Sequence, residues 1–193
     1  MNIVRGIPDL EVATQIAAEG FQQQISSELR EDVGSHLKKG ELIYRLVEDE
    51  KDIGFAIFNV INTDILYLSG VIINSYYQKH GLVASLVHQV RIEVPRVTFL
   101  ALRTQSLRMW VAGERLCKEW YPNKHLQIPN DIIHVGNSVG AYLKCSFPYC
   151  KGIYGSALYG VKPIYTNNFL QNWWDSICTF EQGDAVLCAG RLK

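Results

Sequence analysis

The segment that decides the fold reads Ile73-Asn74-Ser75-Tyr76-Tyr77-Gln78-Lys79-His80-Gly81-Leu82-Val83. The apolar run Ile65–Ile73 leads into it and is typical of a strand. After it, apolar residues recur at helical spacing, at Leu82, Val83, Leu86, Val87 and Val90. This helix is expected to end before Pro95, because the residue ahead of a proline disfavours helical backbone angles. The segment is therefore predicted to be a turn between a strand and a helix.

The start of this predicted helix has the chemistry of an anion site. The first amides of a helix have no carbonyl partner within it, and together they favour a bound anion. Gly81 lets a phosphate group come close to the backbone because it has no side chain. Lys79 and His80 would add side-chain donors, and the preceding strand could hold an extended ligand through main-chain hydrogen bonds. The alternative is that residues 78–83 are only a helix entry with a glycine turn.

Around this motif, strand-like and helical segments mix without strict alternation. Strands are expected at residues 3–5, 42–47, 53–61, 65–73, 97–102, 132–135 and 141–145. A helical region is expected from Pro8 to Gly40, with Gly34 weakening it enough to allow two helices, and another helix over 107–120. Short turns join the strands between residues 42 and 73, which predicts an antiparallel meander. The fold class is therefore α+β.

In this context, Gln78-x-x-Gly81-x-Val83 resembles the acetyl-CoA loop of the GNAT acyltransferase family, which reads Arg/Gln-x-x-Gly-x-Gly/Ala after the fourth strand. Ile73 and Tyr77 also stand where that family places an apolar and an aromatic residue. The resemblance implies a GNAT-like, largely antiparallel mixed sheet flanked by helices over residues 1–145. Residues 146–193 would then form an aromatic-rich C-terminal extension packed on the same domain.

The resemblance also implies the ligand and the reaction. The pyrophosphate of coenzyme A would bind at Gln78, Lys79, His80, Gly81, Leu82, Val83 and Ala84. Ile72 and Ile73 would contact the pantetheine arm, and one amide there would face the thioester oxygen, where charge develops in the transition state. The implied activity is N-acetyltransfer from acetyl-CoA by direct attack of an amine of a protein or a small molecule. No metal is expected.

The sequence departs from the family pattern at two places. Val83 stands where the family prefers Gly or Ala, and its branched side chain crowds the loop while leaving the amide in place. The family's general acid is a tyrosine on the helix after the fifth strand, and Cys117 aligns with it. Tyr121 could replace Cys117 after a shift of register. A plain alternative is that Cys117 is a buried apolar residue.

The base is the second open assignment. Tyr67 falls where many family members carry a carboxylate, although a core position is the plain alternative. An amine with a pKa near 10.4 must lose its proton to some acceptor. Asp64, Glu93 and His134 are therefore alternative bases, beside a chain of waters. His134 lies in a predicted strand and could instead be a hydrogen-bonded structural histidine.

Composition limits other classes of function. The 193 residues are 48% hydrophobic and 20% charged, as in a folded domain. Lys+Arg and Asp+Glu number 19 each, and zero net charge disfavours binding to nucleic acid. No apolar run could span a membrane and no signal peptide opens the chain, so a cytoplasmic protein with free thiols is expected. The C-x4-C spacing of Cys145 and Cys150 matches no familiar zinc motif.

About half of the aromatic residues lie between residues 142 and 180. Core and strand packing is one interpretation, and an acceptor pocket or a homodimer face is another. Tyr159 and Tyr165 could also supply the missing acid from this region. Two functions besides the enzyme remain open. One is a catalytically degenerate GNAT-like module that binds a partner, and the other is a modifier of nucleic-acid bases on the same fold.

Overall fold

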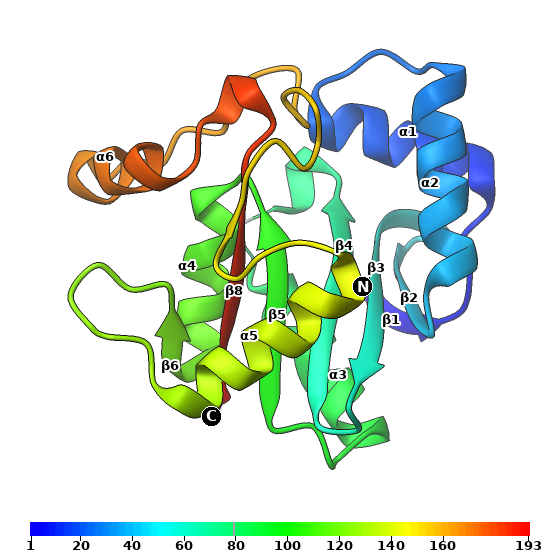
Figure 1. The fold of residues 1–193 in the computed structure, drawn as a ribbon. Coiled ribbons are helices and arrows are strands. Elements are labelled where there is room, and N and C mark those ends of the chain that lie inside the picture. Colours follow the sequence, from blue (N-terminus) through cyan, green and yellow to red (C-terminus); the bar gives the residue numbers. More distant parts are fainter. Residues whose placement is uncertain (79) are drawn as a thin grey trace. The chain divides into compact units, whose positions relative to one another are not determined.

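The computed structural model describes residues 1–78 and 80–193, which fall into two compact units. The first unit comprises residues 1–60 and 68–96, and the second comprises residues 61–67 and 97–193. The chain passes from one unit to the other at the end of β3 (Lys51–Ile61) and again within β4 (Ile65–Ile73). Figure 1 labels the helices and strands of both units.

In the first unit, two helices pack on an antiparallel sheet. Besides β3 and most of β4, its elements are β1 (Asn2–Arg5), α1 (Leu10–Phe21), α2 (Ser27–Lys39), β2 (Leu42–Glu48), the 3₁₀ helix η1 (Ser75–Tyr77) and α3 (Leu82–Glu93). β2 pairs antiparallel with β1 and with β3, as the predicted meander requires. Apolar side chains from α1, α2 and the strands share one buried cluster, which includes Ala13, Ala17, Leu29, Val33, Ile43, Phe55 and Ile57.

The helix start predicted at Pro8-Asp9 is confirmed, whereas the predicted break at Gly34 is wrong. The Asp9 carboxylate accepts hydrogen bonds from the amides of Glu11 and Val12 at 2.9 and 3.2 Å, which caps α1. The break lies between α1 and α2, where Gln22 takes a left-handed φ of 54° and Ser26 caps α2. Local capping therefore decides where the helix is interrupted, while Gly34 is accommodated inside α2.

In the second unit, the C-terminal strand lies between two other strands of the sheet. The elements are β5 (Phe99–Thr104), α4 (Leu107–Leu116), β6 (Cys117–Tyr121), α5 (Asn130–Leu143), β7 (Tyr149–Cys150), α6 (Asn168–Ile177), η2 (Phe180–Gln182) and β8 (Ala185–Leu192). β8 pairs antiparallel with β5 on one side and with β6 on the other, and β7 pairs with its first residues. Residues 185–189 of β8 are at most 1% exposed.

Three sequence predictions fail in this unit. The expected strands at 132–135 and 141–145 lie in or just after α5, and the expected helix over 107–120 stops at Leu116 and continues as β6. α5 buries Ile132, Val135 and Val139, which is helical spacing. The strand that was missed is β8, which lies in the region predicted as an extension, residues 146–193. β8 (Ala185–Leu192) pairs with β5 and is therefore part of the sheet.

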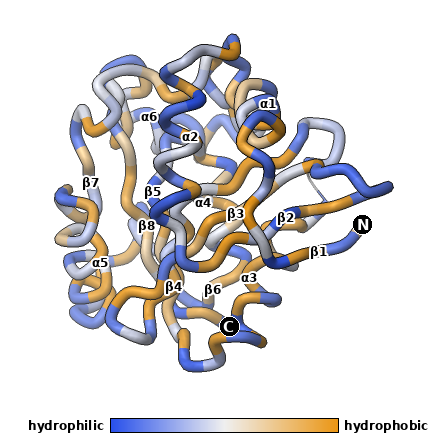
Figure 2. The backbone as a smooth tube through the Cα atoms, turned by 90° about the vertical axis from the view of Figure 1, so that its right-hand side faces the viewer, coloured by the Kyte–Doolittle hydropathy of each residue, from blue (hydrophilic) through white to orange (hydrophobic). Residues whose placement is uncertain are grey.

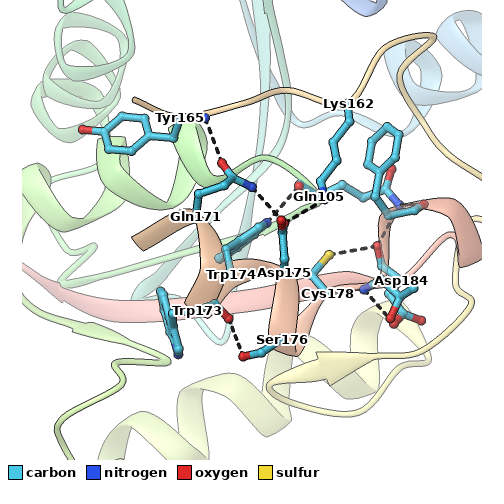
Figure 3. A network of polar contacts seen from close by, with 12 residues as sticks. Gln105, Lys162, Tyr165, Gln171, Trp173, Trp174, Asp175, Ser176, Cys178 and Asp184 are labelled. Atoms are coloured by element: carbon cyan, nitrogen blue, oxygen red, sulfur yellow. Dashed lines mark hydrogen bonds and ion pairs between the residues drawn. The ribbon is translucent and has the colours of Figure 1, made fainter. Parts of the chain in front are cut away.

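Buried polar contacts fix the chain between residues 158 and 184 to the start of α4 (Figure 3). Gln105 is 3% exposed, and its side-chain amide donates to the carbonyl oxygens of Phe180 and Asp184 at 3.2 and 2.8 Å. Its side-chain oxygen accepts from the amide of Leu158 at 2.7 Å, and its main-chain oxygen accepts from the Trp174 indole at 3.0 Å. One buried glutamine thus satisfies four groups from the aromatic-rich region.

The strands carry most of the buried hydrophobic residues, and Figure 2 shows the hydropathy of each residue along the backbone. The described residues contain mostly antiparallel strands and six α-helices. The predicted α+β class is therefore confirmed. Within the described part of the chain, no helix combines the length and the apolar character needed to cross a membrane.

Candidate functional site

The loop between β4 and α3 is fixed to its surroundings in the first unit. The main-chain amide of Asn74 donates to the carbonyl oxygen of Ile53 on β3 at 2.8 Å. Its side-chain amide donates to the carboxylate of Glu19 on α1 at 2.8 Å, and its side-chain oxygen accepts from the amide of Tyr76 at 3.0 Å. Asn74 therefore anchors the end of β4 to both a strand and a helix, and it shapes the turn that follows.

Gln78 takes a different position from the one its place in the motif suggested. Its side-chain amide donates to the carbonyl oxygen of Ile73 at 2.8 Å, so the side chain folds back on the end of β4. Its main-chain amide donates to Ser75 at 3.4 Å, which closes η1. Gln78 thus holds the loop in shape, because both its side-chain amide and its main-chain amide donate within the loop.

The helix α3 begins without a side-chain cap. Gly81 is its N-cap residue and has a φ of +74°, a left-handed conformation that glycine adopts without strain. The amides of Ala84 and Ser85 donate to the Gly81 carbonyl at 2.9 and 3.2 Å. The amides of Gly81, Leu82 and Val83 precede this first hydrogen bond, so no carbonyl of the helix can accept from them. The first turn of α3 carries no acidic side chain, so its positive end is not neutralised.

The predicted ligand-binding residues around this helix start differ in accessibility. His80, Gly81 and Ala84 are exposed, Val83 is half-buried, and Leu82 is 4% exposed with its side chain in the core. The N–H of Ala84 already donates within the helix. Ala84 can therefore contact a ligand through its side chain and not through its N–H. Lys79 lies outside the described residues.

The second half of β4 is more accessible than the first. Ile65 to Leu68 are buried, whereas Ser69, Gly70, Val71 and Ile72 are half-exposed. A Cβ atom added to Gly70 would meet nothing within 4 Å, so that side of the strand is open. Ile73 is 9% exposed, and its carbonyl is held by Gln78. The strand therefore offers its backbone, more than the Ile73 side chain, to an extended ligand.

The candidate acids lie in the second unit and are buried. Cys117 ends α4 and begins β6, where it pairs with Leu192 and is 4% exposed. Tyr121, at the end of β6, is also 4% exposed, and burial together with the nearby carboxylates of Glu119 and Asp131 raises the pKa of its phenol. Tyr121 is therefore protonated at neutral pH, which suits an acid and excludes a base.

The candidate bases have three different environments. Tyr67 is 3% exposed, with the Tyr142 ring edge-on at 6.1 Å, and burial raises the pKa of its phenol far above neutrality. Tyr67 cannot accept a proton at neutral pH. His134 is exposed on α5, not on a strand, and it lines a cavity of about 310 Å³ together with Asp64. Glu93 is paired with Arg5 at 2.8 Å at the end of α3.

Comparison with known proteins identifies the fold. No family model matches the sequence, and a search of curated proteins finds no match. Among solved structures, the ribosomal-protein-S18-alanine N-acetyltransferase from Escherichia coli aligns over all of this chain and 95% of its own, at 15% identity and a TM-score of 0.56. An aminoglycoside 6'-N-acetyltransferase complexed with coenzyme A aligns over 99% of this chain and 97% of its own, at 8% identity and a TM-score of 0.52.

The chain has the GNAT fold. An aminoglycoside 6'-acetyltransferase of type Ii supports the same conclusion, with a TM-score of 0.51 at 15% identity over 64% of this chain and 88% of its own. The resemblance predicted from Gln78-x-x-Gly81-x-Val83 is thus confirmed at the level of the fold. At identities of 8 to 15%, the fold is what these structures establish. Sequence searches find no match because the likeness lies in the arrangement of strands and helices.

Two features of the GNAT fold here were not anticipated from the sequence. Asn74 was not recognised as an anchor, although an asparagine directly after a strand is a common turn former. The second is Arg103, on β5, whose guanidinium donates to the Tyr154 hydroxyl at 3.3 Å and lies 5.0 Å from the centroid of that ring. A charged residue at the end of an apolar run was the only signal for Arg103.

Proposed function

We propose that this protein is a coenzyme A-dependent N-acyltransferase that transfers an acetyl group from acetyl-CoA to an amine. The observation that carries the proposal is the uncapped start of α3 at Gly81, held directly after a fixed strand end. The amides of Gly81, Leu82 and Val83 would bind the pyrophosphate, with no acidic side chain in that turn to oppose it. The GNAT fold and the coenzyme A complex of a structural neighbour support this assignment.

The same motif accounts for how the acyl group would be held. We expect the half-exposed residues of β4 between Ser69 and Ile72 to lie along an extended pantetheine arm. An amide there would stabilise the thioester oxygen as it gains negative charge during attack by the amine. Asn74 and Gln78 fix the strand end before any ligand arrives, so little reorganisation is needed. The acceptor would be an amine of a small molecule or of a protein.

A calorimetric titration with acetyl-CoA tests the proposal directly. We expect binding in the micromolar range, together with amine-dependent release of free thiol in a turnover assay. Free adenosine is the control, because it lacks the pyrophosphate and should bind far more weakly. Failure to bind at millimolar acetyl-CoA would show that the Val83 side chain closes the site, and the proposal would be withdrawn.

A second candidate function follows from the buried acids and the protonated Tyr67. If no side chain can accept the amine proton, the protein binds coenzyme A without consuming its acyl group and serves as an interaction module. Acetyl-CoA binding combined with no thiol release across a panel of amines would establish this alternative. Release of thiol with any amine would exclude it.

The proton donor can be assigned with two matched variants. Cys117→Ala is expected to lower kcat by about 10²-fold with little change in KM, if the Cys117 thiol protonates the departing thiolate. Tyr121→Phe removes only the second candidate donor and should leave kcat nearly unchanged. Thermal unfolding of both variants controls for damage to the core around β6. The opposite pattern would transfer the role to Tyr121, and two active variants would direct attention to Tyr159 and Tyr165.

A further inference from the structure

Cys145 and Cys150 bring their sulfur atoms together in the second unit. Cys145 follows α5, and Cys150 lies in β7. The two Sγ atoms are 2.9 Å apart, and the Cys150 Sγ lies 3.3 Å from the carbonyl oxygen of Ser146. Both cysteines are free thiols. Among the described residues, this is the one pair of cysteines whose sulfur atoms form a hydrogen bond.

The fold holds each sulfur in place from a different side. The amide of Cys145 donates to the Gly140 carbonyl at 2.9 Å, and a Cβ atom on Gly140 would come within 2.6 Å of the Cys145 carbonyl oxygen. Cys150 pairs with Ala185 of β8. Two residues further along the chain, the amide of Gly152 donates to the Asp184 carboxylate at 2.9 Å. The contact between the sulfurs is therefore set by α5 on one side and by β8 on the other.

The two thiols differ in ways that assign them separate roles. Cys145 is half-buried and can be reached from solvent, whereas Cys150 is 2% exposed. Burial, and then the hydrogen bond with Cys145, raise the pKa of Cys150 to about 12, with Arg103 acting in the opposite direction. Cys150 thus keeps its proton, and its thiol donates to the Cys145 sulfur. Cys145 is the thiol that an oxidant meets first.

We propose that Cys145 and Cys150 form a reversible intramolecular disulfide when the protein meets hydrogen peroxide. The Cys145 thiolate attacks one peroxide oxygen, the O–O bond breaks, and Cys145 becomes a sulfenic acid while the other oxygen leaves as water after taking a proton. The Cys150 sulfur then attacks the Cys145 sulfur, and the S–O bond breaks. The hydroxyl leaves with the Cys150 proton as a second water. Two electrons pass from the thiols to the peroxide, and a dithiol reductant returns them.

This disulfide would tie the end of α5 to the strand that pairs with β8. The disulfide would stabilise the protein by restricting residues 145–150 in the unfolded chain. The effect is modest because the closed ring is small. The oxidised protein is expected to melt several degrees above the reduced one, because restricting the unfolded chain raises the free energy of unfolding and therefore raises Tm. Nothing in this step depends on the proposed acyltransferase activity.

The sequence offers a direct test, because trypsin cuts after Lys144 and after Lys151. The resulting peptide, residues 145–151, holds both cysteines of the pair and no other cysteine. The native protein is treated with hydrogen peroxide, then with N-ethylmaleimide under denaturing conditions, and digested. We expect this peptide to carry no maleimide and to be lighter than the unmodified peptide by two hydrogen atoms. Dithiothreitol before alkylation should restore two maleimides.

The other cysteines and two variants serve as controls. Cys117 is 4% exposed and falls in a separate tryptic peptide, so it should keep its label throughout. Cys150→Ser should leave Cys145 as a sulfenic acid that dimedone traps, whereas Cys145→Ser should give no such adduct at residue 150. Two maleimides on the 145–151 peptide after peroxide, or oxidation of Cys145 to a sulfinic acid without loss of the Cys150 label, would overturn the proposal.

Discussion

Replacement of Asp184 by alanine is expected to lower the free energy of unfolding by about 3 kcal/mol, which corresponds to a drop in Tm of about 6–12 °C. Asp184 is 1% exposed. Its carboxylate accepts from the amides of Gly152 and Thr179 at 2.9 and 3.0 Å and from the Lys151 ammonium at 2.8 Å. Alanine would remove the carboxylate that accepts from the amides of Gly152 and the half-buried Thr179. Thermal and urea unfolding would measure the loss.

Lys151→Ala is the matched control for this variant. The Lys151 side chain is 63% exposed, so its ion pair with Asp184 is screened by solvent and should contribute less than about 1 kcal/mol. Asp184 keeps both amides in the Lys151 variant. If the two variants lost the same stability, the ion pair rather than the main-chain hydrogen bonds would be the main contribution of Asp184.

The pH dependence of stability gives an independent check on Asp184. Burial opposes ionisation, but the Lys151 ammonium and the amides of Gly152 and Thr179 outweigh it and lower the pKa of Asp184 to about 2, from 3.8. Because the pKa is depressed in the folded state, this contribution is complete above about pH 4 and is lost as pH falls toward 2. It amounts to about 2 kcal/mol. The difference in stability between the wild type and Asp184→Ala should therefore narrow by that amount between pH 4 and 2.

The parts of the fold that could be predicted from the sequence are those specified locally. β4 has the predicted bounds, Ile65–Ile73, because a largely apolar run lies between a turn and an asparagine. The start of α1 follows from Asp9, whose carboxylate caps the helix two and three residues later. α3 ends at Glu93, shortly before Pro95, because the residue ahead of a proline disfavours helical backbone angles. In each case the deciding residues lie within a few positions of the element.

The parts that could not be predicted depend on residues far away in the chain. Residues 132–145 contain several β-branched residues, which favour a strand on local propensity. The segment is a helix because Gly140 allows the Cys145 backbone to lie against it and because Ile132 and Val139 face a core completed by β8. β8 itself pairs with β5, more than eighty residues earlier. No local pattern contains that pairing.

The candidate site shows the same division. The turn between β4 and α3 and the left-handed Gly81 were predictable from residue types, since glycine is the residue that accepts such a backbone. The role of Gln78 was not, because its side chain turns back to Ile73 instead of outward. The nearness of Cys145 to Cys150 was also beyond the spacing alone. Five positions separate them in the chain, and the pairing of Cys150 with Ala185 of β8 brings the two sulfur atoms into contact.

Ala84→Glu is expected to weaken acetyl-CoA binding by about 10²- to 10³-fold while leaving the protein as stable as the wild type or slightly more so. Ala84 is exposed in the first turn of α3, three residues after the N-cap Gly81. A glutamate at this position can fold back onto the N-cap amide, and its charge complements the helix dipole by about 0.3–1 kcal/mol. The variant should therefore melt no lower than the wild type.

The same glutamate would occupy and repel the proposed pyrophosphate site. Two unit charges about 5 Å apart interact by about 3 kcal/mol at an effective dielectric constant of about 20, and a factor of ten in Kd corresponds to about 1.4 kcal/mol. Calorimetry at low ionic strength would measure the loss of affinity. The loss should shrink as salt is added, because the site is open to solvent and the repulsion is screened.

Two control variants separate charge from size and position. Ala84→Gln has the same shape without the charge, and it should cost less than about tenfold in affinity. His88→Glu puts the same charge on an exposed position one turn further along α3, beyond the free amides, and should change Kd little. Equal binding by Ala84→Glu and the wild type would mean that the pyrophosphate does not lie at the start of α3. Because the glutamate is expected to help the helix and harm the ligand, a loss of binding in this variant cannot be explained by a weakened fold.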